Sequence, residues 1–113
     1  MHVSDTPPWG YWEEYLNEPT YRVKRLIVNP GKRFSLQKHN HRSEYWVVVQ
    51  GDGLVTLDNE QRSVSVGDTV VVPREAVHRL QNKGLIPLII IETQLGICLE
   101  DDIVRLADDW QRT

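Results

Sequence analysis

Short segments rich in Val, Ile, Tyr and Thr recur along the chain, separated by Gly, Pro, Asn and Asp residues that suit tight turns. Almost no stretch shows the 3.6-residue apolar period of an amphipathic helix. The pattern therefore predicts an all-β, antiparallel protein, and short strands of this kind are typical of a jelly-roll barrel. The expected strands span residues 11–16, 21–28, 34–39, 44–50, 54–57, 61–66, 69–72, 78–81 and 88–94.

The acidic segment near the C-terminus fits two kinds of structure. In a helix, Ile103, Leu106 and Trp110 would share one face, whereas residues 102–106 also have a composition that suits a strand. We expect a short strand there.

The 113 residues are enough for one small domain and too few for a core plus a separate cofactor domain. No internal repeat or linker divides the chain. We therefore predict a single domain, with an N-terminal arm and first strand over residues 1–20, a barrel over residues 21–95 and a C-terminal tail over residues 96–113.

Thirteen basic and sixteen acidic residues give a formal charge of -3, and no Lys/Arg run is long enough to follow a nucleic-acid backbone. The single cysteine cannot form an internal disulfide, and the first residues lack the basic and apolar regions of a secretion signal. The longest apolar runs fall far short of the roughly 20 residues that a membrane helix needs. These features indicate a cytoplasmic protein that binds neither nucleic acid nor membrane.

Polar side chains that can bind a metal crowd into residues 37–44. In an extended segment Gln37, His39 and His41 project to the same side, because side chains alternate between faces. Glu44 follows, just before an apolar run, and His78 lies in a later strand. A polar row beside an apolar strand must meet water, a ligand or a metal, since burial without partners is costly. We interpret these residues as a functional site.

The spacing of these residues resembles the two signature motifs of the cupin superfamily. The first motif here runs through Gly31, Gln37, His39, Glu44 and Gly51, with five, one, four and six residues in between. The second runs through Gly67, Pro73, His78 and Asn82, with five, four and three residues in between. The resemblance implies that the first motif supplies two paired ligands and a glutamate, and that the second supplies a histidine. Glu75 stands where the second motif usually has glycine.

The cupin pattern places three or four residues between the second paired ligand and the glutamate. The pair Gln37/His39 leaves four residues before Glu44, whereas the pair His39/His41 leaves two. We therefore predict that one divalent metal ion is bound by Gln37, His39, Glu44 and His78. This mixed nitrogen and oxygen shell suits Zn²⁺, Mn²⁺, Fe²⁺, Co²⁺ or Ni²⁺ and does not choose among them. The alternative is a set of satisfied polar residues inside an empty barrel.

A closer resemblance covers nearly the whole chain. The segment 36–49 is similar to the cupin domain of type II phosphomannose isomerases, found at the C-terminus of bifunctional mannose-1-phosphate guanylyltransferase/mannose-6-phosphate isomerase enzymes and as a stand-alone protein. Further matching stretches are 8–10, 21–28, 73–82, 84–94 and 100–105. The resemblance implies interconversion of mannose 6-phosphate and fructose 6-phosphate. No Gly-rich nucleotide loop is present, so we do not expect guanylyl transfer. Tyr45 stands where the family usually has histidine, and the tail is one residue shorter.

Three further residues are candidates for catalysis in such an isomerase. His41 would lie on the ligand face as a base or as a partner of a ligand, or would simply meet solvent. Glu92 shares strand parity with apolar neighbours, which predicts a carboxylate that points inward. Arg105 matches a family arginine whose guanidinium would hold a phosphate, or it forms a surface ion pair with Asp101 or Asp102. Lys24 and Arg25 point to opposite faces of their strand, so one of them could enter the pocket. The sequence leaves open which one.

Two kinds of function fit these residues. One is a metal-dependent isomerase acting on a phosphorylated hexose. The other is a metal-containing cupin that binds a sugar or small acid without turnover, in polysaccharide-precursor metabolism. A metal-dependent dioxygenase ranks last, because it would more usually use more histidines. We also expect a homodimer, because small cupins usually pair their sheets and the apolar arm over residues 7–12 needs cover.

Overall fold

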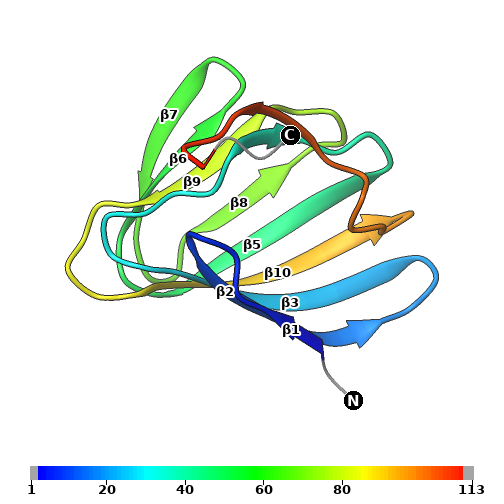
Figure 1. Ribbon diagram of the computed structural model, residues 1–113, viewed down its shortest axis with the longest axis horizontal. Coiled ribbons are helices and arrows are strands. Elements are labelled where there is room, and N and C mark those ends of the chain that lie inside the picture. Colours follow the sequence, from blue (N-terminus) through cyan, green and yellow to red (C-terminus); the bar gives the residue numbers. More distant parts are fainter. Residues whose placement is uncertain (1–2, 111–113) are drawn as a thin grey trace.

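The computed structural model describes residues 3–110, which form two antiparallel sheets facing each other (Figure 1). The six-stranded sheet has the order β1 (Val3–Asp5), β2 (Gly10–Asn17), β3 (Tyr21–Val28), β10 (Leu88–Gly96), β5 (Arg42–Gln50) and β8 (Thr69–Val72). The five-stranded sheet has the order β11 (Val104–Ala107), β4 (Leu36–Lys38), β9 (His78–Asn82), β6 (Gly53–Leu57) and β7 (Glu60–Val64). The expected all-β jelly roll is confirmed as a sandwich whose two sheets, over the described residues, are not hydrogen-bonded into a closed barrel.

Side chains on β5 alternate between the core and the outside, as its sequence predicts. Trp46 and Val48 are buried between the sheets, and Phe34 packs edge-on against Trp46 with 6.0 Å between ring centroids. The same core contains the following residues: Trp9, Leu26, Val28, Val55, Val64, Val70, Val72, Ala76, Leu80, Leu88 and Ile90. The apolar core therefore fills the middle of the sandwich and leaves the polar site residues at one end.

The N-terminal arm lies on its own domain. Strand β1, which was not expected, pairs with β2, and Trp9 belongs to the core. The arm therefore does not need a second subunit to cover it. The outermost parts of the expected arm and tail, residues 1–2 and 111–113, lie outside the described residues.

The C-terminal tail joins the two sheets. The segment after β10 runs from the first sheet across one end of the sandwich to β11 in the second (Figure 1). Strand β11 pairs with β4, which confirms the expected short strand. The expected strand over residues 34–39 is shorter, because β4 ends at Lys38.

The turn before β9 holds Glu75 in the left-handed region, with φ of 71°. Its backbone N–H donates to His39 O at 2.8 Å, which ties this turn to the segment after β4. A positive φ explains why glycine suits this position of the motif, since glycine adopts it without steric cost. The turn thus forms with glutamate present and leaves His78 in place.

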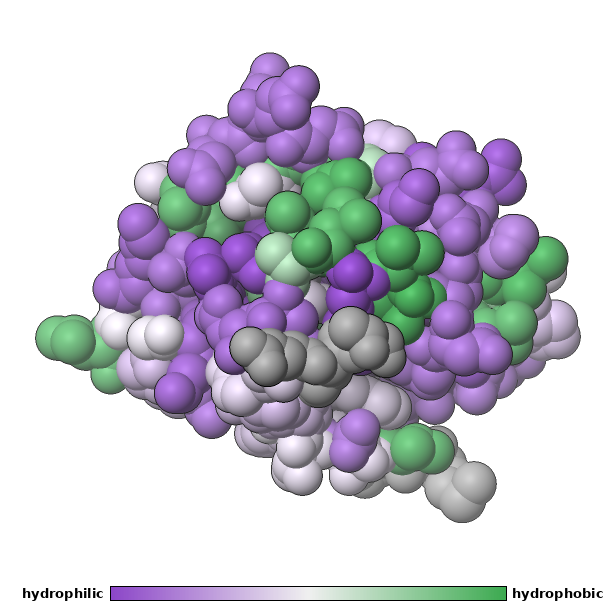
Figure 2. Space-filling view, turned by 45° about the horizontal axis from the view of Figure 1, so that its top comes forward, coloured by the Kyte–Doolittle hydropathy of each residue, from purple (hydrophilic) through white to green (hydrophobic). Residues whose placement is uncertain are grey.

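The described residues contain no helix that is long and apolar enough to cross a membrane. The face of the molecule in Figure 2 is mostly hydrophilic, with a group of hydrophobic residues near its centre.

Candidate metal centre

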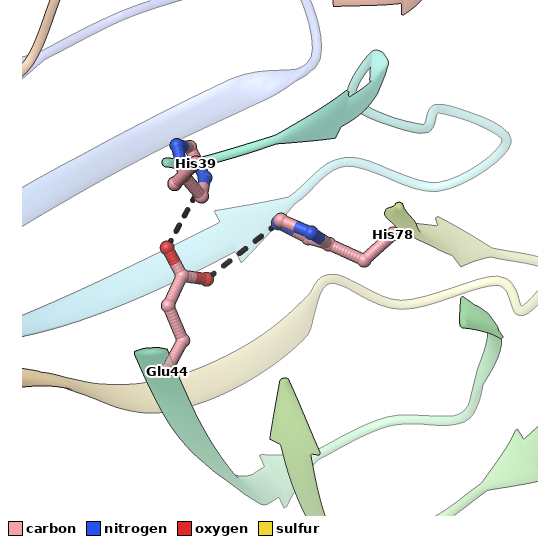
Figure 3. A group of neighbouring side chains, drawn as sticks. All are labelled: His39, Glu44 and His78. Carbon is pink, nitrogen blue, oxygen red and sulfur yellow. Dashed lines mark ion pairs between the residues drawn. The ribbon is translucent and has the colours of Figure 1, made fainter. Parts of the chain in front are cut away.

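Three metal-binding side chains from separate parts of the chain converge at one end of the sandwich. His39 follows β4, Glu44 lies on β5 and His78 begins β9. Their side chains point toward one another (Figure 3), with His39 Nε2 3.2 Å and His78 Nε2 3.7 Å from the two oxygens of Glu44. All are buried, with exposed fractions of 3%, 2% and 0%, and one ligand atom from each lies within 4.8 Å of the others. This group could hold a metal ion.

Backbone carbonyl groups orient both imidazole rings for metal binding. His39 Nδ1 lies 2.6 Å from Asp102 O, and His78 Nδ1 lies 3.0 Å from Ala76 O. Because a carbonyl oxygen only accepts, each Nδ1 carries the proton and each Nε2 presents a lone pair toward Glu44. His78 Nε2 is buried and has no hydrogen-bond partner. An orphaned buried nitrogen beside a carboxylate and a second imidazole fits a metal ligand set.

Arg42 is a site residue that the sequence analysis missed. Its guanidinium donates to Glu44 Oε2 at 2.9 Å and to His39 Nε2 at 3.2 Å. It therefore uses the same two acceptors that a metal would use. The signal was present in the sequence, because Arg42 has the same strand parity as Glu44.

The pKa values of His39 and Glu44 are both lowered, which favours the deprotonated forms of these side chains. Burial lowers the pKa of His39 to about 4. Burial alone would raise the pKa of Glu44, but the neighbouring His78, Arg42 and His39 side chains lower it to about 2. At neutral pH the group therefore offers a neutral His39 and an ionised Glu44, the protonation states in which these residues bind metals.

Gln37 lies beside the group. It pairs in register with His78 on one neighbouring strand and with Arg105 on the other, so the three side chains share one face of the sheet. Gln37 lines the cavity described below, and its Oε1 accepts a hydrogen bond from Ser35 Oγ at 2.9 Å.

A cavity of about 290 Å³ opens beside the group. Its lining includes His39, Arg42, Glu44, Gln37, Trp12, Lys24, Glu92, Gln94, Glu100 and Arg105. The volume lies at the small end of the usual range for ligand pockets, and the lining is unusually rich in charge. Such a space suits a small polar ligand.

Glu92 points into this cavity, as strand parity predicts, and it is buried. Burial, and then the negative charge of Glu44, raise the pKa of Glu92 to about 8. Gln94 Nε2 donates to Glu92 Oε1. At neutral pH a protonated Glu92 can therefore donate a hydrogen bond inside the cavity.

The structure also decides which strand cation enters the cavity. Lys24 is buried, lines the cavity and lies over the Trp12 ring, with 3.9 Å from Nζ to the centroid. Arg25 points to the other face and pairs with Glu13. The cavity cation is therefore Lys24.

Two residues that the sequence analysis singled out lie elsewhere. His41 does not line the cavity, and its side chain is exposed. The expected alternation fails there because β4 ends at Lys38. Tyr45 is 41% exposed on the outer face of β5, so its difference from the family pattern does not alter the cavity.

Arg105 lines the cavity, and its Nε is buried without a hydrogen-bond partner. Of the two ion-pair partners that the sequence offered, Asp101 and Asp102, the second is engaged elsewhere. The Asp102 carboxylate instead accepts from the backbone N–H groups of Asn40 and His41, each at 2.9 Å.

Comparisons with known proteins place the chain in a family. Residues 1–108 match the family described as "Mannose-6-phosphate isomerase C-terminal". The chain is 45% identical to the alginate biosynthesis protein AlgA of Pseudomonas aeruginosa, over 99% of this chain and 24% of that protein. It is 42% identical to a mannose-1-phosphate guanylyltransferase of Sinorhizobium fredii, over 96% of this chain and 22% of that protein. The chain thus spans about a quarter of the length of these relatives.

A solved structure confirms the fold. The oxalate decarboxylase of Lactobacillus farciminis superimposes with a TM-score of 0.80 at 23% identity, covering 92% of this chain and 33% of that one. At this identity the likeness concerns the fold alone.

The comparisons contradict the expected interconversion of mannose 6-phosphate and fructose 6-phosphate. The curated relatives are named for guanylyl transfer and for alginate biosynthesis, and not for an isomerase. That prediction was wrong, and these names fit better with the alternative of a cupin in polysaccharide-precursor metabolism. The family resemblance itself is confirmed by the match over residues 1–108 and by the curated relatives. The chain belongs to the family of cupin domains described as mannose-6-phosphate isomerase C-terminal.

Proposed function

We propose that this chain is a metal-containing cupin domain that binds a sugar phosphate in polysaccharide-precursor metabolism without converting it. The proposal rests on the convergence of two imidazole lone pairs and a carboxylate, from His39, His78 and Glu44, of which His39 and Glu44 line the cavity. The names of the curated relatives support the metabolic setting. Arg105, whose buried Nε has no hydrogen-bond partner on the cavity wall, supports a ligand with a negative charge.

The proposed ligands of one divalent metal are His39, Glu44, His78 and Gln37. The oxygen of Gln37 accepts one hydrogen bond and keeps a second lone pair for a metal. A bound metal would attract the oxygen atoms of the sugar as a Lewis acid. Arg42 must release its two acceptors when the metal binds.

Arg105 and Glu92 are proposed to hold the sugar. The Arg105 Nε has no partner in the cavity, so it offers a donor to an oxygen of the ligand. A protonated Glu92 offers a second donor on the opposite sheet. Both residues act here as binding groups.

The test is calorimetric titration of the metal-loaded protein with mannose 6-phosphate and mannose 1-phosphate, beside a coupled assay for fructose 6-phosphate. We expect saturable binding of a sugar phosphate, its loss in His78→Ala, its retention in the exposed-site control His41→Ala, and no turnover. Absence of binding for both sugar phosphates would contradict the binding role. Turnover that disappears in His78→Ala would contradict the non-catalytic role.

We also propose that the chain forms a homodimer through the outer face of the six-stranded sheet. Tyr45, Val47 and Val49 on β5 are 41%, 42% and 45% exposed, and Val71 on β8 pairs with Tyr45. These side chains carry no formal charge, so a second copy of the same patch can pack against them without repulsion. An exposed apolar patch on a sheet is a typical interaction surface.

A further inference from the structure

A second charged group lies in the same cavity, away from the metal-binding residues. Lys24 is only 4% exposed. A buried ammonium group needs an anion nearby, because an unpaired buried charge is very costly.

The anion is Glu100, from the segment between β10 and β11. Its Oε1 pairs with Lys24 Nζ and lies 2.8 Å from Arg22 Nη1. The Glu100 side chain is 52% exposed, whereas those of Lys24 and Arg22 are 4% and 12% exposed. Glu100 therefore reaches from the solvent onto two recessed cations, and it lines the cavity together with Lys24.

The backbone on either side of Glu100 is fixed. Leu99 O accepts from Arg42 Nη1 at 3.1 Å and from the backbone N–H of Asp102 at 3.2 Å. The Asp102 carboxylate is held by two backbone N–H groups of the segment after β4. The Glu100 side chain can therefore rotate outward while its segment stays attached.

The two cations also have contacts other than Glu100. Arg22 Nε lies 3.1 Å from Glu14 Oε1 and donates to Asn17 Oδ1 at 3.2 Å, which leaves Nη1 directed at Glu100. Lys24 rests on the Trp12 ring. The site is thus formed by side chains that have other supports.

The register sets the distance from these cations to the metal-binding group. Arg22, Gln94 and Glu44 are direct neighbours across β3, β10 and β5. Two strand spacings separate Arg22 from Glu44, which is about 10 Å between backbones. The two cations and the metal-binding group are therefore separate positions on one face of this sheet.

We propose that Lys24 and Arg22 form a phosphate subsite, that Glu100 closes it when no ligand is bound, and that the phosphate of a sugar phosphate displaces the Glu100 carboxylate. A phosphate carries more negative charge and more acceptor oxygens than a carboxylate, so it competes well for both cations. An uncharged sugar leaves Glu100 in place. The proposal rests on the proposed function, and it assigns the phosphate to this end of the cavity instead of to Arg105.

The test compares Glu100→Gln with the neighbouring Asp101→Asn, which removes the same charge from an exposed residue of the same segment. Calorimetry with mannose 6-phosphate should show affinity raised roughly fivefold in Glu100→Gln and changed less than about twofold in Asp101→Asn. Titration with mannose should show no difference between Glu100→Gln and the wild type. The variant Arg22→Gln should lose most of the preference for the phosphorylated sugar. Arg22 is chosen because its side chain is closer to the surface than that of Lys24.

Three results would overturn the proposal. Equal affinities of Glu100→Gln and Asp101→Asn for mannose 6-phosphate would remove the closing role of Glu100 and leave the proposed function standing. Loss of the phosphate preference in Arg105→Ala, with Arg22→Gln unchanged, would move the subsite to the other sheet. Absence of sugar-phosphate binding in both the wild type and Glu100→Gln would remove the subsite together with the proposed function.

Discussion

The two faces of the six-stranded sheet have opposite characters, and both differ from an ordinary sheet. At one end of the inner face the charged side chains of Glu44 and Lys24 are buried, while the outer face exposes Tyr45 and Val47. An antiparallel sheet usually packs apolar residues inward and polar residues outward. Buried charge and exposed apolar side chains each cost free energy, so both indicate surfaces that meet something else. The inner face meets a metal and a small ligand in our account, and the outer face meets a second subunit.

The largest effect should come from Arg42, which pairs with the buried Glu44 carboxylate. Arg42→Gln leaves Glu44 buried without its guanidinium, so in chelator the free energy of unfolding should fall by about 3 kcal/mol. Added metal should recover most of that loss, because it takes over the acceptors of Arg42. Urea unfolding with chelator and with metal measures both effects.

The matched control for Arg42 is Arg33→Gln. Arg33 forms an exposed pair with Asp109, so its loss should cost less than about 1 kcal/mol, with or without metal. An Arg42→Gln protein as stable as Arg33→Gln in chelator would show that the inner charges do not depend on Arg42.

Glu92 should make stability depend on pH. Its pKa is raised to about 8 in the folded protein from 4.5, so between these values the folded state holds a proton that the unfolded state has released. The free energy of unfolding of the wild type therefore falls as pH rises through this window, because the folded state must give up the proton of Glu92. In chelator, the stability of Glu92→Gln relative to wild type should increase by roughly 2 kcal/mol or more from pH 5 to pH 8.5.

Urea unfolding across pH gives this difference. The lowered pKa of His39 works in the opposite direction, with stability lost as pH falls from about 6.5 to about 4, but it is common to both proteins and cancels. Glu60→Gln, at an exposed position, should show a constant difference from wild type. A pH-independent difference for Glu92→Gln would mean that Glu92 is ionised inside the cavity at pH 7.

The outer face is tested by placing a charge in its centre. Val47→Lys should weaken the homodimer at least about tenfold, because the lysine would face its own copy across the two-fold axis. Val66→Lys adds the same charge in the turn between β7 and β8 and should leave the dimer intact. Light scattering over a concentration series measures both. A wild type that is monomeric at micromolar concentration would contradict the dimer.

The smallest effect concerns the turn before β9. Glu75→Gly should raise the free energy of unfolding by about 0.5–1 kcal/mol, because glycine adopts the positive φ of this position without steric cost. Asp58 also has a positive φ, but its Oδ1 accepts from the Val77 N–H at 3.0 Å. Asp58→Gly should therefore bring no gain. Thermal unfolding of the two variants tests whether the positive φ alone determines how much stability glycine adds at each position.

The fold and most of the site could be predicted from the sequence for physical reasons. Alternation along β10 fixes which side chains point inward, so the inward position of Glu92 was predicted correctly, whereas Glu44 was found from the motif spacing. Alternation holds only within a strand, and the position of His41 was lost because β4 ends at Lys38. The pairing of Lys24 with Glu100 joins residues that are 76 positions apart. No local pattern reports such a contact, and it required the path of the C-terminal tail.

The central claim is that a metal is bound at the buried end of the inner face. Elemental analysis of purified protein should find about one divalent metal per chain in the wild type and in His41→Ala, and almost none in His78→Ala. The β-type circular dichroism should survive in both variants. Metal that is retained in His78→Ala, or lost in His41→Ala, would contradict the account.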